Sequence, residues 1–336
     1  MAPAAVHLLR GDAERAPRII ASPEPPDEDA RLLDGLLAHP AQINPKFFYD
    51  DLGSALYGAI TRLDEYYPAR LEAEMFASHR SAISAEIPRG AQWIDLGCGD
   101  GGKCGPWLNR TGARRYIGVD IAQDGLRGAI AQIIRDCPVE EAIGVTADLT
   151  RQLQLRELLD ERAWPRVFFY PGSSIGNFDP PAALALLRAI RHDCGSDGRL
   201  LIALDFTRDH ATLAAAYDDA LGVTAAFNRN VLRVVNRRLS GNFDLRNFRH
   251  YVQFNEVEGR VEMHLVARQT QTVRFELAGA AAGIERRFNS GESILTECSY
   301  KYAPGQFAEL LEWAGFARHW LWSHASGNYG VFLAIP

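Results

Sequence analysis

The segment IDLGCGDGGKC (residues 94–104) joins a short apolar run to a cluster of glycines. Gly97, Gly99 and Gly102 match the pattern G-x-G-x-x-G, which is typical of dinucleotide-binding loops. Gly97, Gly99 and Gly101 match G-x-G-x-G, a spacing that suits a different nucleotide-bearing cofactor. In either pattern, glycine lets the backbone approach a ligand closely and direct its amides at it. The segment therefore predicts a nucleotide-type site, and the surrounding residues must decide which cofactor it binds.

A regular alternation of strands and helices begins at this segment. Short apolar runs predict strands at residues 92–96, 115–120, 142–149, 166–172 and 199–206. The stretches between them predict helices at residues 103–112, 124–136, 150–162 and 180–193. Alternation at this spacing predicts a parallel, doubly wound sheet. The last residues, 317–336, predict two strands around a Gly-Asn turn, which would place an antiparallel hairpin at the end of that sheet.

Other stretches depart from this alternation. Residues 21–29 predict a Pro-rich acidic linker, and residues 30–40 predict an amphipathic helix that Pro40 stops. Residues 211–239 predict a helix, whereas residues 250–277 show a strand pattern. We therefore expect two domains: a Rossmann-like domain and a second α+β substrate-binding domain. Their predicted ranges are 71–206 with 301–336 for the first domain, and 20–70 with 207–300 for the second.

The composition is that of a globular, core-forming protein, with 47% hydrophobic and 23% charged residues among 336. A net charge of -6 does not favour a basic face for nucleic acid. The five cysteines are scattered and form no C-x-x-C pair, which argues against a zinc site or a disulfide framework. Arg10 interrupts the only apolar stretch near the start. We therefore expect a cytoplasmic protein without a metal, a membrane span or a nucleic-acid partner.

Three carboxylates stand at the ends of the first three predicted strands. Asp95 lies two residues before Gly97, where it would repel a pyrophosphate but attract an ammonium or sulfonium group. Asp120 could accept the ribose hydroxyls, and Asp148 could accept from an adenine amino group. Together they favour S-adenosylmethionine (SAM) over NAD. An NAD-dependent oxidoreductase stays as the alternative, since each aspartate alone could be a cap or turn residue.

Five longer blocks of sequence carry further information. They are FFYDDLGSALYGAITRLDEYYPARLE (47–72), IDLGCGDGGK (94–103), FYPGSSIGNF (169–178), AYDDALGVTAAFNRNVLRVVNRRL (216–239) and TECSYKY (296–302). In these blocks and in their order the chain resembles a known family, the histidine-specific N-alpha-methyltransferases of ergothioneine biosynthesis. The resemblance implies a class I SAM-dependent methyltransferase fold with a Rossmann-like sheet. It also implies that the α-amino nitrogen of L-histidine is methylated three times to give hercynine.

The resemblance also implies site residues. For SAM it implies Gly97, Lys103, Asp120 and Asp148, and we predict Asp95, Gly99 and Leu149 beside them. For the amino acid it implies Tyr66, Asn177, Tyr217, Glu297 and Ser299, and we predict Gly172 and Met263 beside them. Lys103 could reach the methionine carboxylate of SAM because it directly follows the glycines.

The implied amino-acid residues have suitable chemistry. Asn177 and Tyr217 can donate to the substrate carboxylate without forming an ion pair with the amine. Glu297 can accept an imidazole N–H, and Ser299 can bond the other ring nitrogen as donor or acceptor. These two lie two residues apart, so on an extended segment they face the same side. Tyr66 and Met263 could also contact the ring.

The expected reaction is an in-line displacement, in which alignment and desolvation matter more than an acid. Tyr49, or a water that it holds, is expected to orient the amine, and no residue is assigned as a general base. Two alternatives stay open here. The first is a relative that methylates tryptophan or a modified histidine, and the second is a binding module without catalysis. We expect the protein to act as a monomer on a small molecule.

Overall fold

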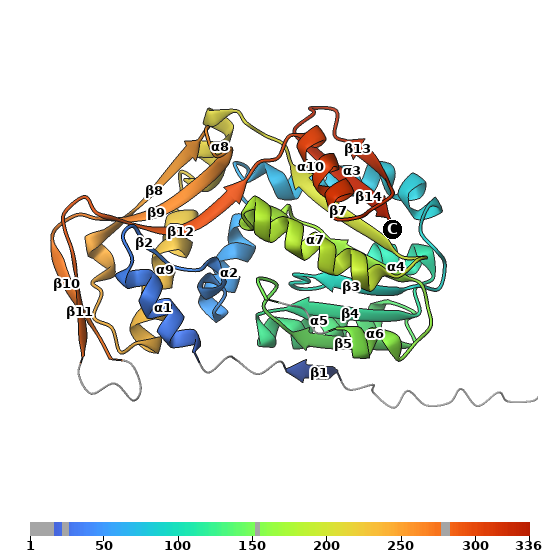
Figure 1. The fold of residues 1–336 in the computed structure, drawn as a ribbon, viewed down its shortest axis with the longest axis horizontal. Helices are drawn as coiled ribbons and strands as arrows, with labels where there is room; N and C mark the ends of the chain where they lie inside the picture. Colours follow the sequence, from blue (N-terminus) through green and yellow to red (C-terminus); the bar gives the residue numbers. More distant parts are fainter. Residues whose placement is uncertain (1–16, 22–26, 152–154, 277–282) are drawn as a thin grey trace, which may run out of the picture.

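The computed structural model describes residues 17–21, 27–151, 155–276 and 283–336. The predicted linker at residues 21–29 and the predicted helix at residues 150–162 therefore lie partly outside the described residues. Two parts of the molecule lie side by side in Figure 1, each built on its own sheet. None of the helices in the described ranges is long and apolar enough to cross a membrane.

The larger sheet has eight strands in the order β1-β5-β4-β3-β6-β7-β14-β13. All neighbouring strands from β1 to β7 pair in parallel, whereas β14 runs antiparallel to both β7 and β13. This confirms the predicted doubly wound sheet with its terminal hairpin. The strands are β1 (Arg18–Ala21), β3 (Gln92–Leu96), β4 (Arg115–Asp120), β5 (Glu141–Thr146), β6 (Arg166–Tyr170), β7 (Arg199–Asp205), β13 (Arg318–Ser323) and β14 (Tyr329–Ile335).

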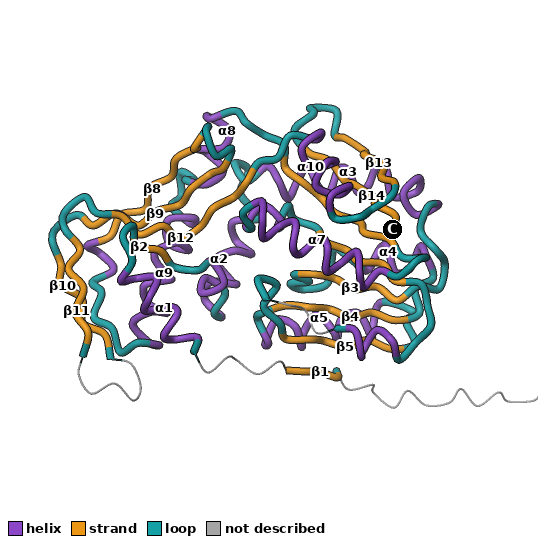
Figure 2. The backbone as a smooth tube through the Cα atoms, in the orientation of Figure 1, coloured by secondary structure: helices purple, strands orange, loops and turns teal. Residues whose placement is uncertain are grey.

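Helices cover both faces of this sheet, as the purple and orange segments of Figure 2 show. Alternate residues of each strand face opposite layers, so Trp93 packs with α3 and α4 while Ile94 packs on the other side with α7. One face carries α3 (Tyr67–Ala85), α4 (Gly105–Thr111) and α5 (Gln123–Asp136). The other carries α6 (Arg156–Asp160), α7 (Pro180–Cys194) and α10 (Pro304–Trp313).

The glycine loop after β3 shows which glycine pattern the backbone uses. Gly97, Gly99 and Gly101 have φ angles of 69°, 54° and 74°, a region that side chains with a Cβ rarely adopt. Gly102 is absent from the residues with positive φ among those described. The conformation therefore requires glycine at the three positions of G-x-G-x-G, which is the pattern predicted for the cofactor other than a dinucleotide.

The second part is built on a smaller sheet in the order β2-β12-β9-β8, with an antiparallel ribbon of β10 and β11 beside it. Helices α1, α2 and α9 cover one side of it (Figure 1). Its strands are β2 (Ala41–Gln42), β8 (Phe248–Asn255), β9 (Arg260–Ala267), β10 (Gln271–Phe275), β11 (Ile284–Phe288) and β12 (Ser293–Tyr300). Its helices are α1 (Glu28–Leu37), α2 (Asp51–Ile60), α8 (His210–Tyr217) and α9 (Val223–Arg238). Short 3-10 turns are η1 (Pro45–Phe48), η2 (Ser174–Asn177) and η3 (Leu245–Asn247).

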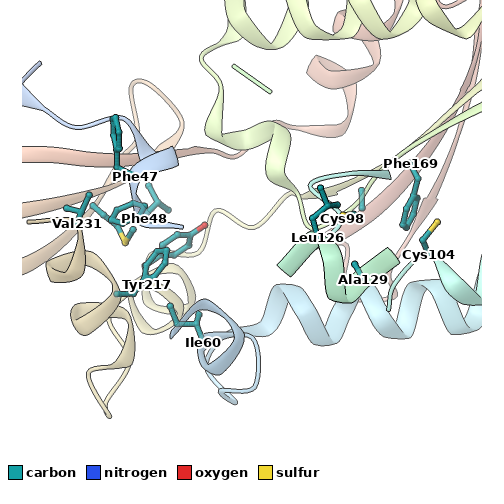
Figure 3. Close-up of a cluster of buried hydrophobic side chains, with 14 of the residues drawn as sticks. Phe47, Phe48, Ile60, Cys98, Cys104, Leu126, Ala129, Phe169, Tyr217 and Val231 are labelled. Carbon is teal, nitrogen blue, oxygen red and sulfur yellow. The ribbon is translucent and has the colours of Figure 1, made fainter. Parts of the chain in front are cut away.

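One buried apolar cluster runs through both parts. Figure 3 shows Phe48, Tyr217 and Val231 in the second part, and Cys98 and Phe169 against the larger sheet, all within this cluster. A core that is continuous across both parts favours a fixed arrangement of one against the other. The predicted domain limits at residues 70, 206 and 300 stay a prediction.

Three details differ from the sequence expectation. Strand β1 was not expected, and it adds a parallel edge strand next to β5. The helix expected over residues 211–239 is two helices, because Asp219 caps the second one and Gly222 has a φ of 74° between them. The helix expected from residue 30 begins at Glu28.

The loop conformation leads to a stability prediction. Gly101→Ala should lower the free energy of unfolding by about 1–2 kcal/mol, the usual price of a Cβ in left-handed backbone. Gly102→Ala is the matched control, because its φ is not in the positive range and the nearest atom to its Cβ would be a side-chain oxygen of Asp100, at 3.1 Å. Urea unfolding of the two variants should show the difference, and equal losses would contradict the role of positive φ.

Candidate functional site

The glycine loop and the end of β4 are joined by Asp120. Its carboxylate accepts the Gly99 amide at 2.9 Å and the Ala122 amide at 2.9 Å, so it is fixed at the carboxyl end of its strand. A Cβ built on Gly97 or Gly99 would meet no atom within 4 Å, so the loop backbone is open to a ligand on that side. Parallel sheets of this kind bind ligands at the carboxyl ends of their strands. Both features fit the nucleoside part of SAM.

Asp95 is a buried carboxylate with an incomplete set of partners. It is 1% exposed, and Tyr116 donates to its Oδ2 at 2.9 Å. Among the described residues, no hydrogen-bond partner is found for its Oδ1. Burial raises the pKa of Asp95 to about 7, against the lowering effect of the Tyr116 hydrogen bond. A nearby cationic group would stabilise its ionised form, which fits a ligand that carries ammonium and sulfonium groups.

Lys103 pairs with Glu72 of α3, a residue that was not predicted from the sequence. The Lys103 ammonium forms an ion pair with Glu72, whose carboxylate also accepts the Gly172 amide and the Tyr329 hydroxyl. Glu72 is 1% exposed, whereas nearly half of the Lys103 side chain is exposed. The lysine therefore lies at the edge of the loop with a free side toward solvent, where a ligand carboxylate could meet it.

Asp148, after β5, is held by the second part of the molecule. Lys46 of η1 donates to its Oδ2 at 3.0 Å, and the Thr150 hydroxyl donates to its Oδ1 at 2.6 Å. These bonds lower the pKa of Asp148 although burial raises it. Leu149 beside it packs against the apolar cluster of the α7 face. Lys46 thus links the predicted adenine region to the segment before α2.

A single pocket collects the other predicted residues. Its wall includes Tyr49, the proposed orienting residue, and all seven residues predicted for the amino acid: Tyr66, Gly172, Asn177, Tyr217, Met263, Glu297 and Ser299. Both parts of the molecule contribute to this wall. A second cleft shares Asn177 and Glu297 with the pocket and extends to Lys46 and Thr150, next to Asp148.

Aromatic side chains form one side of the pocket. The ring of Tyr49 lies 5.8 Å from that of Tyr57 and 6.0 Å from that of Phe227, both edge-on. Burial raises the pKa of Tyr49 and of Tyr66 well above the usual value. Both phenols therefore keep their protons at neutral pH and act as hydrogen-bonding groups rather than bases.

Glu297 reaches the pocket through an irregularity in β12. The register with β9 shifts between Leu295 and Glu297, so that Glu297 pairs with Met263 and both line the pocket. Thr296, at the shift, donates to Asn228 at 2.8 Å. Burial raises the pKa of Glu297 to about 7, although the positive charge of Lys301 opposes this. Ser299 follows two residues later and lines the same pocket, as the alternation of an extended strand predicts.

Ser299 and Tyr217 are in direct contact. The Tyr217 hydroxyl lies 2.9 Å from Ser299 Oγ, and Lys301 donates to both oxygens. Lys301 also forms an ion pair at 2.7 Å with Asp205, the last residue of β7. Neither charged residue was predicted from the sequence. Of the 36 basic residues only Lys46, Lys103 and Lys301 are lysines, and all three lie at these sites, which is the signal that could have found them.

The described residues contain no group of three or more His, Cys, Asp or Glu side chains that could hold a metal ion. The strand order, the glycine loop and the carboxylates at β3, β4 and β5 define a class I SAM-dependent methyltransferase. Residues 28–336 match the family model described as histidine-specific methyltransferase, SAM-dependent. The chain belongs to this family.

Bacterial relatives agree with the family model. The chain is 39% identical to a histidine N-alpha-methyltransferase of Mycolicibacterium smegmatis over 307 residues, which covers 90% of this chain and 92% of the relative. It is 37% identical to a histidine N-alpha-methyltransferase of Mycobacterium tuberculosis, covering 89% and 92%. A Neurospora crassa protein, ergothioneine biosynthesis protein 1, is 27% identical over 88% of this chain and 33% of its own length.

The raised pKa of Glu297 leads to a pH-dependent stability prediction. The folded protein keeps this proton up to about pH 7, whereas the unfolded chain releases it near pH 4.5, so stability falls as pH rises between these values. Glu297→Gln removes this loss. Its free energy of unfolding relative to the parent should increase by about 2 kcal/mol from pH 5 to pH 8. Urea unfolding at both pH values measures this, and a constant difference would show that Glu297 is not desolvated.

Proposed function

We propose that this chain transfers three methyl groups from SAM to the α-amino nitrogen of L-histidine, giving hercynine, the first step of ergothioneine biosynthesis. Membership of the histidine-specific family supports the substrate and the methyl donor. The observation that supports it most is the single pocket that holds Glu297 together with Asn177, Tyr217 and Ser299. An acid, an amide and hydroxyls in one enclosed wall match a zwitterionic amino acid with a polar ring.

The predicted SAM residues would hold the methyl donor in this way. SAM would supply a methyl group on a positively charged sulfur, so an amine can take the methyl carbon while S-adenosylhomocysteine leaves. Asp120 would accept from the ribose, and Asp148 with Leu149 would contact the adenine. Lys103 would bind the methionine carboxylate, while Asp95 would favour the positive charges. These assignments follow the family pattern and the open side of the glycine loop.

The predicted histidine residues would orient the acceptor. Asn177 and Tyr217 would hold the carboxylate, while Glu297 and Ser299 would hold the ring together with Tyr66. Met263 would pack on the imidazole face. Tyr49, as a neutral phenol, would orient the amine through a hydrogen bond. The incoming amine must be neutral, and a free α-amino group has a pKa of about 8 to 9, so a small fraction of it is neutral at pH 7 without a general base.

Two finer points belong to the same proposal. We propose a monomer, in which every residue assigned to the substrate comes from the same chain. It works in the cytoplasm, since its five cysteines are all free, as expected in a reducing compartment.

A screen of the twenty amino acids tests the function directly. Each is incubated with the protein and SAM, and the release of S-adenosylhomocysteine is measured. Histidine alone should give a strong signal and should consume about three equivalents of SAM. A signal with tryptophan and none with histidine would instead support the alternative substrate.

Recognition of the carboxylate leads to a further prediction. Histamine and histidinamide should be poor substrates, because both lack the carboxylate that Asn177 and Tyr217 are proposed to hold. Asn177→Ala should raise the KM for histidine about 10- to 100-fold, as expected from losing a hydrogen bond to a charged group. The affinity for S-adenosylhomocysteine, measured by calorimetry, should stay nearly unchanged. Efficient methylation of histamine would overturn this orientation.

Recognition of the ring depends on Glu297. Phenylalanine and leucine should be refused, because they would leave this half-buried, desolvated carboxylate without a partner. Glu297→Ala should lose about 2–4 kcal/mol in kcat/KM for histidine. The same change removes a charge and opens volume, so tryptophan should gain, especially when Met263 is also shortened to Val. Parent-level activity of Glu297→Ala with histidine would remove Glu297 from the site.

A further inference from the structure

Lys301 is a buried positive charge in the wall of the amino-acid pocket. It follows β12, is 2% exposed, and has three oxygen partners: Asp205 at 2.7 Å, Tyr217 at 3.0 Å and Ser299 at 3.1 Å. An ammonium group has three N–H donors, so each proton of Lys301 has one acceptor. Arginine, with its planar fork of five donors, would not fit this arrangement. A buried charge with all its donors used is held in one place.

Asp205 compensates the charge of Lys301 and is itself fully engaged. It is completely buried, and Tyr67 donates to its Oδ2 at 2.6 Å while the Thr207 amide donates to its Oδ1 at 3.0 Å. The position of the Lys301 ammonium is therefore set by Asp205, which also lines the pocket, and by Tyr67 and Thr207, which are outside the pocket lining. Neither Asp205 nor Tyr67 is among the residues predicted to bind substrate.

The hydroxyl protons of Tyr217 and Ser299 can be counted from this geometry. Lys301 donates to both oxygens, so neither hydroxyl can donate to Lys301. The two oxygens are 2.9 Å apart, and this bond uses the proton of one of them. Only one hydroxyl proton is left to point at a ligand. If Tyr217 donates to the substrate, Ser299 can only accept a hydrogen bond from the substrate. If Ser299 donates to the substrate, Tyr217 can only accept.

We propose that Lys301 is a positioning residue, which joins Tyr217 and Ser299 into one hydrogen-bonded unit with a single proton to donate to the bound amino acid. The inference rests on the proposed function, since Tyr217 is assigned to the substrate carboxylate and Ser299 to the ring. The carboxylate and the ring of the histidine are then recognised jointly rather than independently. When Tyr217 donates to the carboxylate, Ser299 accepts an N–H from the ring.

A first experiment compares variants of the buried pair. Lys301→Met alone leaves Asp205 as an unpaired buried charge and is expected to destabilise the protein. The double variant Lys301→Met/Asp205→Asn removes both charges at similar volume, so it is the form to assay. It should bind S-adenosylhomocysteine like the parent and show a KM for histidine at least 10-fold higher, with a smaller change in kcat. An unchanged KM in a folded double variant would overturn the proposal.

A double-mutant cycle tests the shared proton itself. Tyr217→Phe, Ser299→Ala and their combination are measured for kcat/KM with histidine, first with Lys301 and Asp205 present and then in the double variant. With Lys301 and Asp205 present, the combined variant should lose little more kcat/KM than the weaker of the two single variants, because either substitution alone breaks the hydrogen-bonded unit. In the Lys301→Met/Asp205→Asn background, the coupling between Tyr217→Phe and Ser299→Ala, expressed as a ratio of kcat/KM values, should fall at least fivefold. Independent losses in the parent, or the same coupling in both backgrounds, would refute the shared unit.

The outcomes separate this inference from the proposed function. A parent protein that does not methylate histidine would contradict the function, whatever the variants do. An active parent with independent effects of Tyr217 and Ser299 would contradict only the role of Lys301. Lys301→Arg is a further control, because it keeps a positive charge beside Asp205. If Lys301 only neutralised Asp205, this variant would have the KM of the parent. Because the planar guanidinium does not match three separate acceptors, we expect a KM for histidine that is raised as in the double variant; a parent-like KM would show that charge alone suffices.

Discussion

A buried ion pair between Lys301 and Asp205 joins the two sheets of the molecule. Asp205 ends β7 of the larger sheet, and Lys301 follows β12 of the smaller one. Two charges taken out of water are stable only when their geometry and their remaining hydrogen bonds are nearly complete. Tyr67, Thr207 and the pocket hydroxyls supply those bonds. The pair therefore specifies one relative position of the two sheets, and the pocket lies where they meet.

The position of the pocket follows from this junction. Asn177 lies at the end of η2, beyond β6 of the larger sheet, while Glu297 and Ser299 come from β12 of the smaller one. Gly176 lies close enough to β12 that a Cβ would be 2.8 Å from the Tyr300 carbonyl oxygen, so glycine is needed for this approach. The loop after β6 and strand β12 are thus in backbone contact, and the residues assigned to the two ends of the substrate are held at a fixed spacing.

The larger sheet was predictable because its signals are local. The run RYIGVD, bounded by polar residues, is β4 residue for residue, and Gly97 to Gly101 mark the loop by their own conformation. Strand β1 was missed because four residues carry little signal and their pairing depends on the edge of β5, which is distant in sequence. Glu72 and Asp205 were missed for a similar reason. Their roles come from contacts with Lys103 and Lys301 through space, 31 and 96 positions away in the chain.

The chemistry explains why so much of this structure serves alignment. An amine that attacks the methyl carbon of a sulfonium, with S-adenosylhomocysteine as the leaving group, needs a straight approach and a dry site, and it needs no strong acid or base. The phenols around the pocket, Tyr49 and Tyr66, have pKa values raised by burial and stay neutral, so they cannot take a proton from the amine at pH 7. The pKa of Glu297 is about 7, close to neutral pH, but Glu297 is proposed to bind the imidazole ring and not the amine. The amine must therefore lose its proton before or during binding, and the rate depends on how closely the two sheets hold the substrate in line.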